Sequence, residues 1–212
     1  MTNKHIYISV AGVLGTGKST AARLISERLA FQLIEEQFVK NSFLPLFYED
    51  PKRWAFHSQL FFLQEKARQL EKIKELLKEK NIVQDCPVEQ DYLGYAKAQE
   101  VLGNMNNEEF SLYEKIYQSL NGHLPQPDLI VQLDSDLPLL QKRISKRGRE
   151  IEKGINQEYL QTLIKLQDEW LTKHPKNQVL RIDTDKLNLA ENKKDQESFV
   201  KMVKDRILTI TK

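Results

Sequence analysis

The sequence has very little cysteine, almost no net charge and no long apolar run. Its single cysteine, Cys86, excludes an intramolecular disulfide and a cysteine-rich zinc site, and it fits a reducing cytoplasm. With 32 Lys and Arg against 30 Asp and Glu, the formal net charge is +2, which gives no large positive potential to bind nucleic acid. No apolar run approaches the ~18 to 20 residues of a membrane span, and the N-terminal stretch lacks the features of a signal peptide. We therefore expect a cytoplasmic protein without a nucleic-acid or membrane partner.

The composition favours one folded domain. The 212 residues are 40% hydrophobic and 29% charged, which supplies a core and excludes a disordered chain. No repeat or linker divides them, so a single domain over residues 1–212 is expected.

Segments with strand spacing alternate with segments of helical spacing along the whole chain. The predicted strands are 5–11, 31–36, 81–86, 127–133 and 178–183, and the predicted helices are 19–30, 51–80, 88–102, 108–120, 138–146, 156–173 and 197–210. This alternation predicts an α/β fold in three layers, α/β/α, around a five-stranded, mostly parallel sheet. Ligands of such sheets bind at the carboxyl ends of the strands.

A glycine-rich loop follows the first predicted strand and opens the first predicted helix. Residues 12–19, GVLGTGKS, fit the pattern G-x-x-x-x-G-K-[ST]. Glycines let backbone N–H groups turn inward around phosphate oxygens at a helix N-terminus. Lys18 would reach the β- and γ-phosphates, and Ser19 would offer its hydroxyl to Mg²⁺. We predict an ATP site made of Gly12, Val13, Leu14, Gly15, Thr16, Gly17, Lys18, Ser19 and Thr20.

A phosphate loop alone does not separate a GTPase, a motor ATPase and a small-molecule kinase. About 190 residues follow the loop without a second domain, which favours a compact kinase over a mechanical ATPase. The acceptor of the phosphoryl group must therefore be sought in the rest of the chain.

Two further segments carry a resemblance to a known family. Glu35 and Glu36 end the second predicted strand, and residues 47–63 read FYEDPKRWAFHSQLFFL. On these residues the chain resembles the deoxyribonucleoside kinases, especially the bacterial deoxyadenosine/deoxyguanosine kinase branch, from the phosphate loop almost to the C-terminus. The resemblance implies a P-loop kinase fold, phosphoryl transfer from ATP to the 5′-hydroxyl of a deoxynucleoside, Mg²⁺ as cofactor, and a homodimer. Glu35 is expected to be the surface member of the glutamate pair.

The resemblance assigns roles on the acceptor side. Glu36 matches the general base that accepts the proton of the nucleoside 5′-hydroxyl, and Tyr48 matches the tyrosine that bonds the sugar 3′-hydroxyl. Gln59 matches the glutamine that bonds the edge of the base. Lys66 and Asp91 fall where purine- and cytidine-accepting members carry an arginine and an aspartate, which suggests a purine deoxynucleoside. The alternative for each position is an ordinary half-buried or solvated helix residue.

A basic run lies later in the chain, where residues 142–152 read KRISKRGREIE. Guanidinium groups that close over a transferring phosphoryl group exclude water and stabilise its charge. The run resembles the arginine-rich lid of the family, at about residues 143–154. The resemblance implies that Arg143, Arg147 and Arg149 contact phosphates and that Glu152 takes a second hydrogen bond from the 3′-hydroxyl. A solvated basic helix end is the alternative.

The match breaks at the end of the third predicted strand. The resembling kinases carry an acid followed by arginine and serine, whereas this chain reads Asp85-Cys86-Pro87. Asp85 keeps the acid that helps to hold Mg²⁺. The missing guanidinium would normally touch the 5′-hydroxyl region, and one charge-assisted hydrogen bond is worth about 1.5 to 3 kcal/mol. Cys86 is expected to be buried and inert rather than a reactive nucleophile. Gln37 also replaces a family proline, which weakens the placing of Glu36.

Three functions therefore stay open. An active deoxynucleoside kinase is favoured because the loop, the base, the sugar contacts and the lid are all retained. A degenerate member would bind nucleotide with little turnover, and the sequence at Cys86 is its main support. A nucleoside monophosphate kinase would need a further cation, for which Lys40 or Arg53 could serve. If Cys86 is a defect, Cys86→Arg should raise kcat at least tenfold, and no change would mean that another group supplies the charge or that the pocket has been rebuilt.

Overall fold

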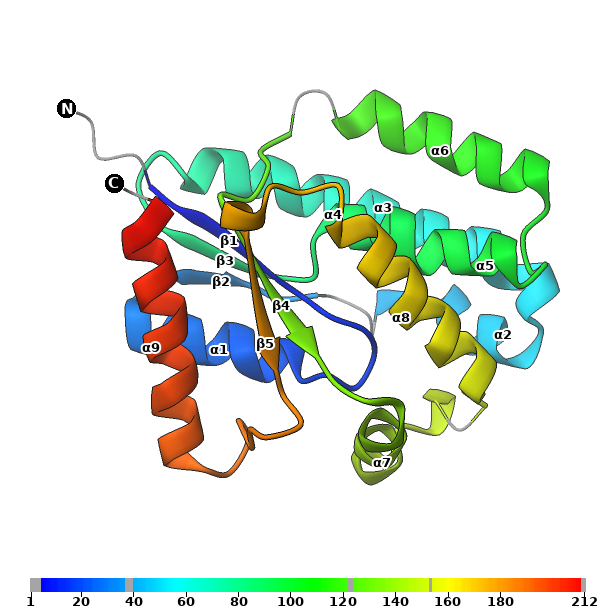
Figure 1. Ribbon diagram of the computed structural model, residues 1–212. Coiled ribbons are helices and arrows are strands. Elements are labelled where there is room, and N and C mark those ends of the chain that lie inside the picture. The colour runs from blue at the N-terminus through cyan, green and yellow to red at the C-terminus, as the bar shows by residue number, and fades with distance from the viewer. Residues whose placement is uncertain (1–4, 37–39, 122–123, 153, 211–212) are drawn as a thin grey trace.

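The fold is built around a parallel sheet of five strands. The computed structural model describes residues 5–36, 40–121, 124–152 and 154–210 (Figure 1). The strands are β1 (Tyr7–Ala11), β2 (Gln32–Ile34), β3 (Ile82–Asp85), β4 (Leu129–Asp134) and β5 (Val179–Asp183), in the order β2-β3-β1-β4-β5. All neighbouring strands are parallel, so their carboxyl ends meet at one edge.

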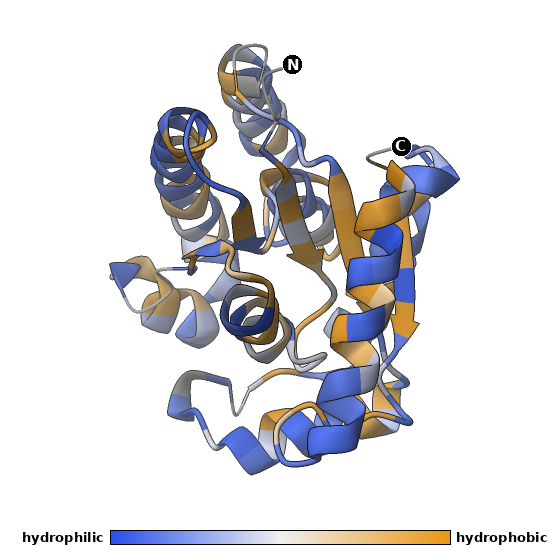
Figure 2. Cartoon of the chain, turned by 90° about the vertical axis from the view of Figure 1, so that its left-hand side faces the viewer, coloured by the Kyte–Doolittle hydropathy of each residue, from blue (hydrophilic) through white to orange (hydrophobic). Residues whose placement is uncertain are grey.

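Helices cover both faces of the sheet because alternate strand side chains point to opposite sides. In β1, Ile8 and Val10 pack with residues of α1 (Lys18–Leu29) and α9 (Lys193–Ile210). Tyr7 points to the other face, where α3 (Pro51–Leu76) and α6 (Asn107–Asn121) supply the core. Figure 2 shows the apolar strands enclosed between helices whose outer sides are largely hydrophilic. The predicted three-layer α/β/α architecture is confirmed.

Several helix ends follow from local chemistry. The Asp50 carboxylate accepts the N–H of Arg53 at the start of α3, and Asp136 accepts the N–H of Leu139 at the start of α7 (Leu137–Arg147). Gly148, with φ 65°, ends α7 in the left-handed conformation. The next helix is α8 (Gln157–Leu171). Among the described residues, no helix combines the length and the apolar character that a membrane span requires.

Three local features differ from the sequence prediction. The helix predicted over 88–102 is three segments, which are α4 (Val88–Gln90), the π-helix η2 (Asp91–Ala96) and α5 (Lys97–Val101). Helix α2 (Phe43–Glu49) was not predicted, since its seven residues are too few to show a helical period; Pro45 stands in its first turn, where no N–H is needed. Helix α9 begins at Lys193, four residues before the predicted start, and the side chain of Asn192 accepts the N–H of Lys194 there.

Two short 3₁₀ turns, η3 (Glu150–Glu152) and η4 (Lys176–Gln178), also lie in the described part of the chain. The apolar side of α3 packs inside the chain, because Leu63, Leu70 and Ile73 are buried in the core. Gln37, which was singled out in the sequence, lies outside the described residues.

Candidate active site

The phosphate loop joins β1 to α1 and requires glycine at two points. Gly12 has φ 147°, and a Cβ there would lie 2.6 Å from Thr16 Oγ1 and 2.8 Å from the carbonyl oxygen of Leu133. Gly17 has φ 97° and stands directly before α1. The ammonium of Lys18 lies over the loop, where it donates to the carbonyl oxygen of Gly12 at 2.8 Å. The loop thus directs backbone N–H groups and one cation toward the same space.

An oxygen-lined corner lies beside this loop. Ser19 Oγ donates to Asp85 Oδ2 at 2.6 Å, across from the end of β3. Asp85 is buried, and its Oδ1 has no hydrogen-bond partner within the described part of the chain. Burial raises the pKa of Asp85, and the charge of Glu36 adds to the rise. A hydroxyl and a carboxylate with an unused buried oxygen fit the oxygen ligands that Mg²⁺ prefers.

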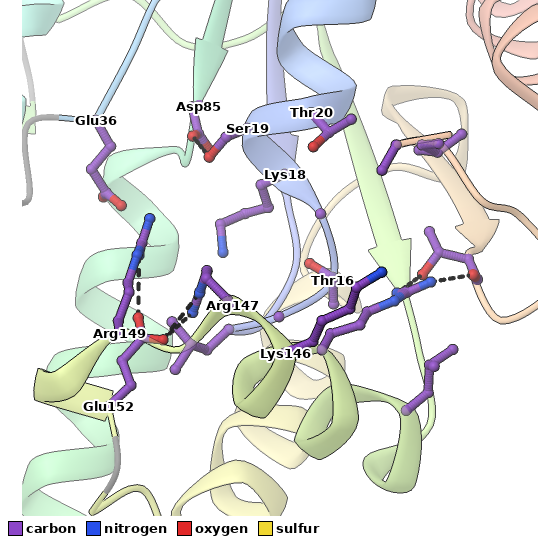
Figure 3. Close-up of a pocket in the computed structure, with 18 of the residues that line it drawn as sticks. Thr16, Lys18, Ser19, Thr20, Glu36, Asp85, Lys146, Arg147, Arg149 and Glu152 are labelled. Atoms are coloured by element: carbon purple, nitrogen blue, oxygen red, sulfur yellow. Dashed lines mark hydrogen bonds and ion pairs between the residues drawn. The ribbon is translucent and has the colours of Figure 1, made fainter. Parts of the chain in front are cut away.

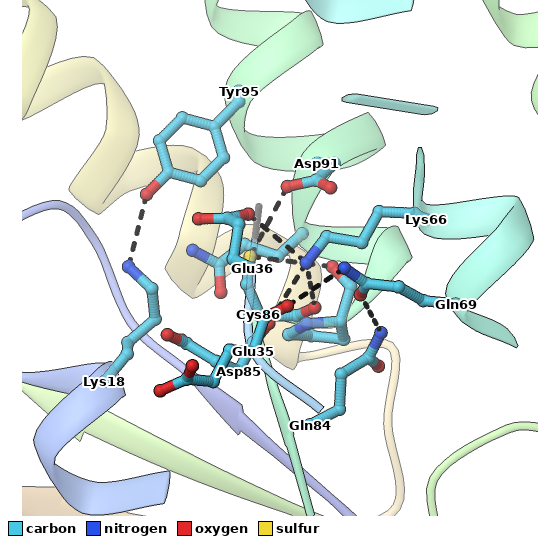
Figure 4. Close-up of polar contacts among 12 residues, drawn as sticks. Lys18, Glu35, Glu36, Lys66, Gln69, Gln84, Asp85, Cys86, Asp91 and Tyr95 are labelled. Atoms are coloured by element: carbon cyan, nitrogen blue, oxygen red, sulfur yellow. Dashed lines mark hydrogen bonds and ion pairs between the residues drawn. The ribbon is translucent and has the colours of Figure 1, made fainter. Parts of the chain in front are cut away.

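The acceptor side lies beyond Lys18, at the end of β2. The carboxylate of Glu36 faces the interior, where Lys66 Nζ lies 3.2 Å from Glu36 Oε1 (Figure 4). Glu35 is exposed instead and pairs with Arg23 at 3.0 Å, and both side chains border the cavity described below. The expectation that Glu35 is the surface member of the pair is confirmed.

One cavity of about 1190 Å³ joins the phosphate loop to the acceptor side. Tyr48 from α2 and Gln59 from α3 line it, and Asp91 and Tyr95 from η2 lie opposite. Gln59 is 4% exposed, and its Oε1 has no partner among the described residues. Burial raises the pKa of Asp91 to about 7, a rise that the charge of Lys66 opposes. The acceptor end therefore offers the amide oxygen of Gln59 for a hydrogen bond and, in Asp91, a carboxyl group with a raised pKa.

The lid closes the cavity from the side of α7. Arg147 donates to Glu152 Oε2 at 2.7 Å, and Arg149 donates to Glu152 Oε1 at 3.2 Å (Figure 3). Glu152 is 4% exposed, so a buried carboxylate holds both guanidinium groups at the cavity. Arg143 also lines the cavity, but its guanidinium binds Thr184 Oγ1 at 2.9 Å and the Thr184 carbonyl oxygen at 2.7 Å. Phosphate contacts by these three arginines stay predictions.

At position 86, where the resembling kinases carry an arginine, the structure places a buried thiol beside Asp91. Cys86 is fully buried, and its thiol donates to Asp91 Oδ1 at 3.4 Å. Burial raises the pKa of the Cys86 thiol well above its ordinary value, which agrees with an inert side chain. Lys66 is 1% exposed and faces Glu36 and the carbonyl oxygens of Asp85 and Cys86, so it is not among the residues that line the cavity. Contact between Lys66 and a nucleoside base stays a prediction.

Sequence reasoning missed two contributors to the cavity, Tyr95 and the segment Thr184–Glu191, and one residue that holds the phosphate loop, Gln90. Tyr95 Oη lies 3.4 Å from Lys18 Nζ, and Gln90 exchanges two hydrogen bonds with the backbone of Gly12. The segment Thr184–Glu191, which follows β5, lines the cavity at its far end. The position of this segment after a parallel strand was an available signal, since ligands bind at the carboxyl ends of such strands. Tyr95 lies one helical turn after Asp91, and this spacing was the only signal for it.

A parallel sheet with a phosphate loop after β1 and an arginine-bearing lid opposite the loop defines a P-loop kinase. The model of the family described as "Deoxynucleoside kinase" matches residues 8–208. The chain belongs to the deoxynucleoside kinase family, as its sequence motifs predicted.

Relatives of known activity and solved structure agree with this assignment. The chain is 32% identical to the deoxyguanosine kinase of Bacillus subtilis over 210 residues, which cover 97% of this chain and 100% of the relative. It is 29% identical to the deoxyadenosine/deoxycytidine kinase of the same organism, with 94% and 92% covered. The structure of deoxyadenosine kinase from M. mycoides with dCMP and dCDP bound superposes with a TM-score of 0.83 at 25% identity, covering 96% of this chain and 100% of that one.

Proposed function

We propose that the protein transfers the γ-phosphoryl group of ATP to the 5′-hydroxyl of a purine deoxynucleoside. The observation that carries the proposal is that Glu36 and the phosphate loop line one cavity from opposite sides, with Gln59 at its acceptor end. The names of relatives support a purine, since they include a deoxyguanosine kinase and a deoxyadenosine kinase.

On the acceptor side, Glu36 accepts the proton of the 5′-hydroxyl as that oxygen attacks the γ-phosphorus. Tyr48 and Glu152 bond the sugar 3′-hydroxyl. This role is supported by their shared position in the cavity and by the charge of Glu152, which adds to burial in raising the pKa of Tyr48. Gln59 and Asp91 meet the edge of the base. A site whose buried polar groups are matched by the substrate rejects analogues that leave these groups unpaired.

On the donor side, backbone N–H groups of residues 12–20 surround the phosphates. Lys18, Arg147 and Arg149 place positive charge where the transferring group gains negative charge, and Arg143 joins them by leaving Thr184. Ser19 and Asp85 would hold Mg²⁺, which supplies charge neutralisation to the triphosphate. The proposed function also includes a cytoplasmic location, a role in nucleoside salvage and a homodimer.

A phosphorylation assay with ATP and Mg²⁺ tests the proposal across the four deoxynucleosides, their ribonucleoside forms and the corresponding monophosphates. We expect turnover of deoxyguanosine or deoxyadenosine to the 5′-monophosphate. Turnover of monophosphates alone would mean that the acceptor is a nucleoside monophosphate. The geometry speaks against this, because Lys40 is exposed and neither Lys40 nor Arg53 lines the cavity. Silence toward every acceptor, with ATP still bound, would contradict the proposal and favour a degenerate binding subunit.

A further inference from the structure

Lys66 is a buried cation whose donors are directed at the protein itself. It stands on the inner side of α3, 1% exposed, beside the carboxyl ends of β2 and β3 (Figure 4). Its Nζ lies 3.2 Å from Glu36 Oε1, 3.0 Å from the Asp85 carbonyl oxygen and 2.7 Å from the Cys86 carbonyl oxygen. An ammonium group has three N–H donors, so each donor has a protein oxygen to face.

The surroundings keep this ammonium charged. Burial by itself would lower the pKa of Lys66, but the nearby charge of Glu36 raises it, and the net shift is upward. Asp85 from β3 and Asp91 from η2 also face this point, together with the thiol of Cys86. Lys18 approaches from the phosphate loop. Several acidic groups therefore converge here from different elements, and within the described part of the chain Lys66 is the cation that contacts Glu36.

Lys66 also holds the turn that follows β3. Cys86 has φ 67°, a left-handed conformation that is uncommon for a residue with a side chain. Its N–H donates to the Val10 carbonyl oxygen at 3.0 Å, and its own carbonyl oxygen accepts from Lys66. Since Asp85 directly precedes this turn, the same ammonium fixes the backbone of Asp85 and the carboxylate of Glu36.

We propose that Lys66 is a positioning residue that holds Glu36 as an oriented carboxylate, fixes the turn at Asp85 and Cys86, and so supplies the positive charge that the chain lacks at position 86. This inference rests on the proposed function, in which Glu36 is the general base. It places the compensating charge on α3 rather than on the turn itself. Cys86 is then not a defect, because the site has been rebuilt around a different cation.

Lys66→Met removes the charge and keeps most of the side-chain length. We expect kcat for the deoxynucleoside to fall about ten- to hundredfold, the effect of one charge-assisted contact, with KM changed less than about threefold. Lys66→Arg should retain more activity than Lys66→Met, because the charge survives. Lys72→Met, at an exposed site on the same helix, is the matched control and should leave kcat unchanged. ATP binding and cooperative unfolding are measured for every variant.

A double-mutant cycle with Glu36→Gln asks whether Lys66 acts through Glu36. In the Glu36→Gln background, Lys66→Met should reduce kcat by less than about threefold, since the carboxylate that it holds is gone. Fully additive losses would overturn the proposed action of Lys66 on Glu36.

Cys86→Arg in the wild-type background supplies a test that does not depend on the folding of Lys66→Met, and the same change in Lys66→Met adds a test of rescue. With Lys66 present, the new arginine should raise kcat less than tenfold, whereas in Lys66→Met it should restore at least tenfold. A gain of tenfold or more with Lys66 present would overturn the proposal, because no effective cation would then have been in place. An active wild type with an equally active Lys66→Met overturns this inference alone, and a wild type inactive on every deoxynucleoside overturns the proposed function beneath it.

Discussion

At the scale of single residues, Asp91 shows how burial changes what a carboxyl group does. It is 3% exposed, accepts a hydrogen bond from the Cys86 thiol, and has one oxygen without a partner in the described residues. Burial raises its pKa to about 7, far above the ordinary value of a carboxyl group. The protonated form of a carboxyl group can donate a hydrogen bond as well as accept one.

The raised pKa of Asp91 has a consequence for stability. The folded pKa of about 7 exceeds the unfolded value of about 3.9, so the folded chain keeps a proton that the unfolded chain releases between these values. Stability contributed by this group is thus present below pH ~4 and is lost as the pH rises to ~7. Asp91→Asn lacks this loss, and we expect its stability relative to wild type to increase by about 2 to 4 kcal/mol between pH ~4 and ~7.

Urea unfolding of both proteins at several pH values across this window measures the effect. Asp205→Asn, at an exposed site on α9, is the control for replacing an aspartate outside the cavity. A difference between Asp91→Asn and wild type that does not change with pH would show that Asp91 is already ionised throughout the window.

At the scale of elements, the lid is a helix end held by one acid. Arg147 at the end of α7 and Arg149 just beyond it share the two oxygens of Glu152 in η3. Gly148 lets the chain turn between the two arginines. This arrangement holds both guanidinium groups at the cavity, where the proposed reaction would use them to stabilise the charge of the transferring phosphoryl group.

Arg147→Ala tests the lid in the assigned reaction. We expect kcat to fall about ten- to hundredfold while KM for ATP rises less than about threefold, because the contact strengthens in the transition state. Arg68→Ala, an exposed arginine on α3 paired with Glu65, is the matched control. Steady-state kinetics with both substrates varied distinguish the two parameters. A change confined to KM would show that Arg147 does not stabilise the transition state more than it stabilises the bound substrate.

The helices and strands also show which parts of the structure could be predicted from local sequence patterns. Period-two and period-3.6 patterns predicted all five strands and most helices, because the strands β1, β3 and β4 are rich in buried apolar residues and helices such as α3 bury one side. The π-helix η2 was missed because it packs between distant elements, α3 and α8, and the seven residues of α2 are too few to show a helical period. The family resemblance pointed to Glu36, Gln59 and the basic run 142–152, which border one cavity, whereas Tyr95 meets Lys18 through tertiary contact between distant segments.

At the scale of the whole molecule, the parallel sheet gathers distant segments at its carboxyl edge. The phosphate loop follows β1, Glu36 follows β2, Asp85 ends β3 and the segment Thr184–Glu191 follows β5. Helices on both faces fix the sheet, so these groups meet with little freedom. A donor phosphate and an acceptor hydroxyl bound in this one cavity are therefore brought together, which replaces a bimolecular encounter by a positioned one.

The measurement that tests this account most directly compares wild type with Glu36→Gln on deoxyguanosine and deoxyadenosine, with Glu35→Gln as the neighbouring control. We expect Glu36→Gln to lower kcat about 10²- to 10⁴-fold, the usual contribution of a general base, with ATP binding unchanged. Glu35→Gln should keep kcat within about threefold of wild type, because Glu35 is exposed and an exposed ion pair such as that with Arg23 contributes little. A Glu36→Gln enzyme that keeps kcat within threefold of wild type would contradict the account, since the base would then lie elsewhere.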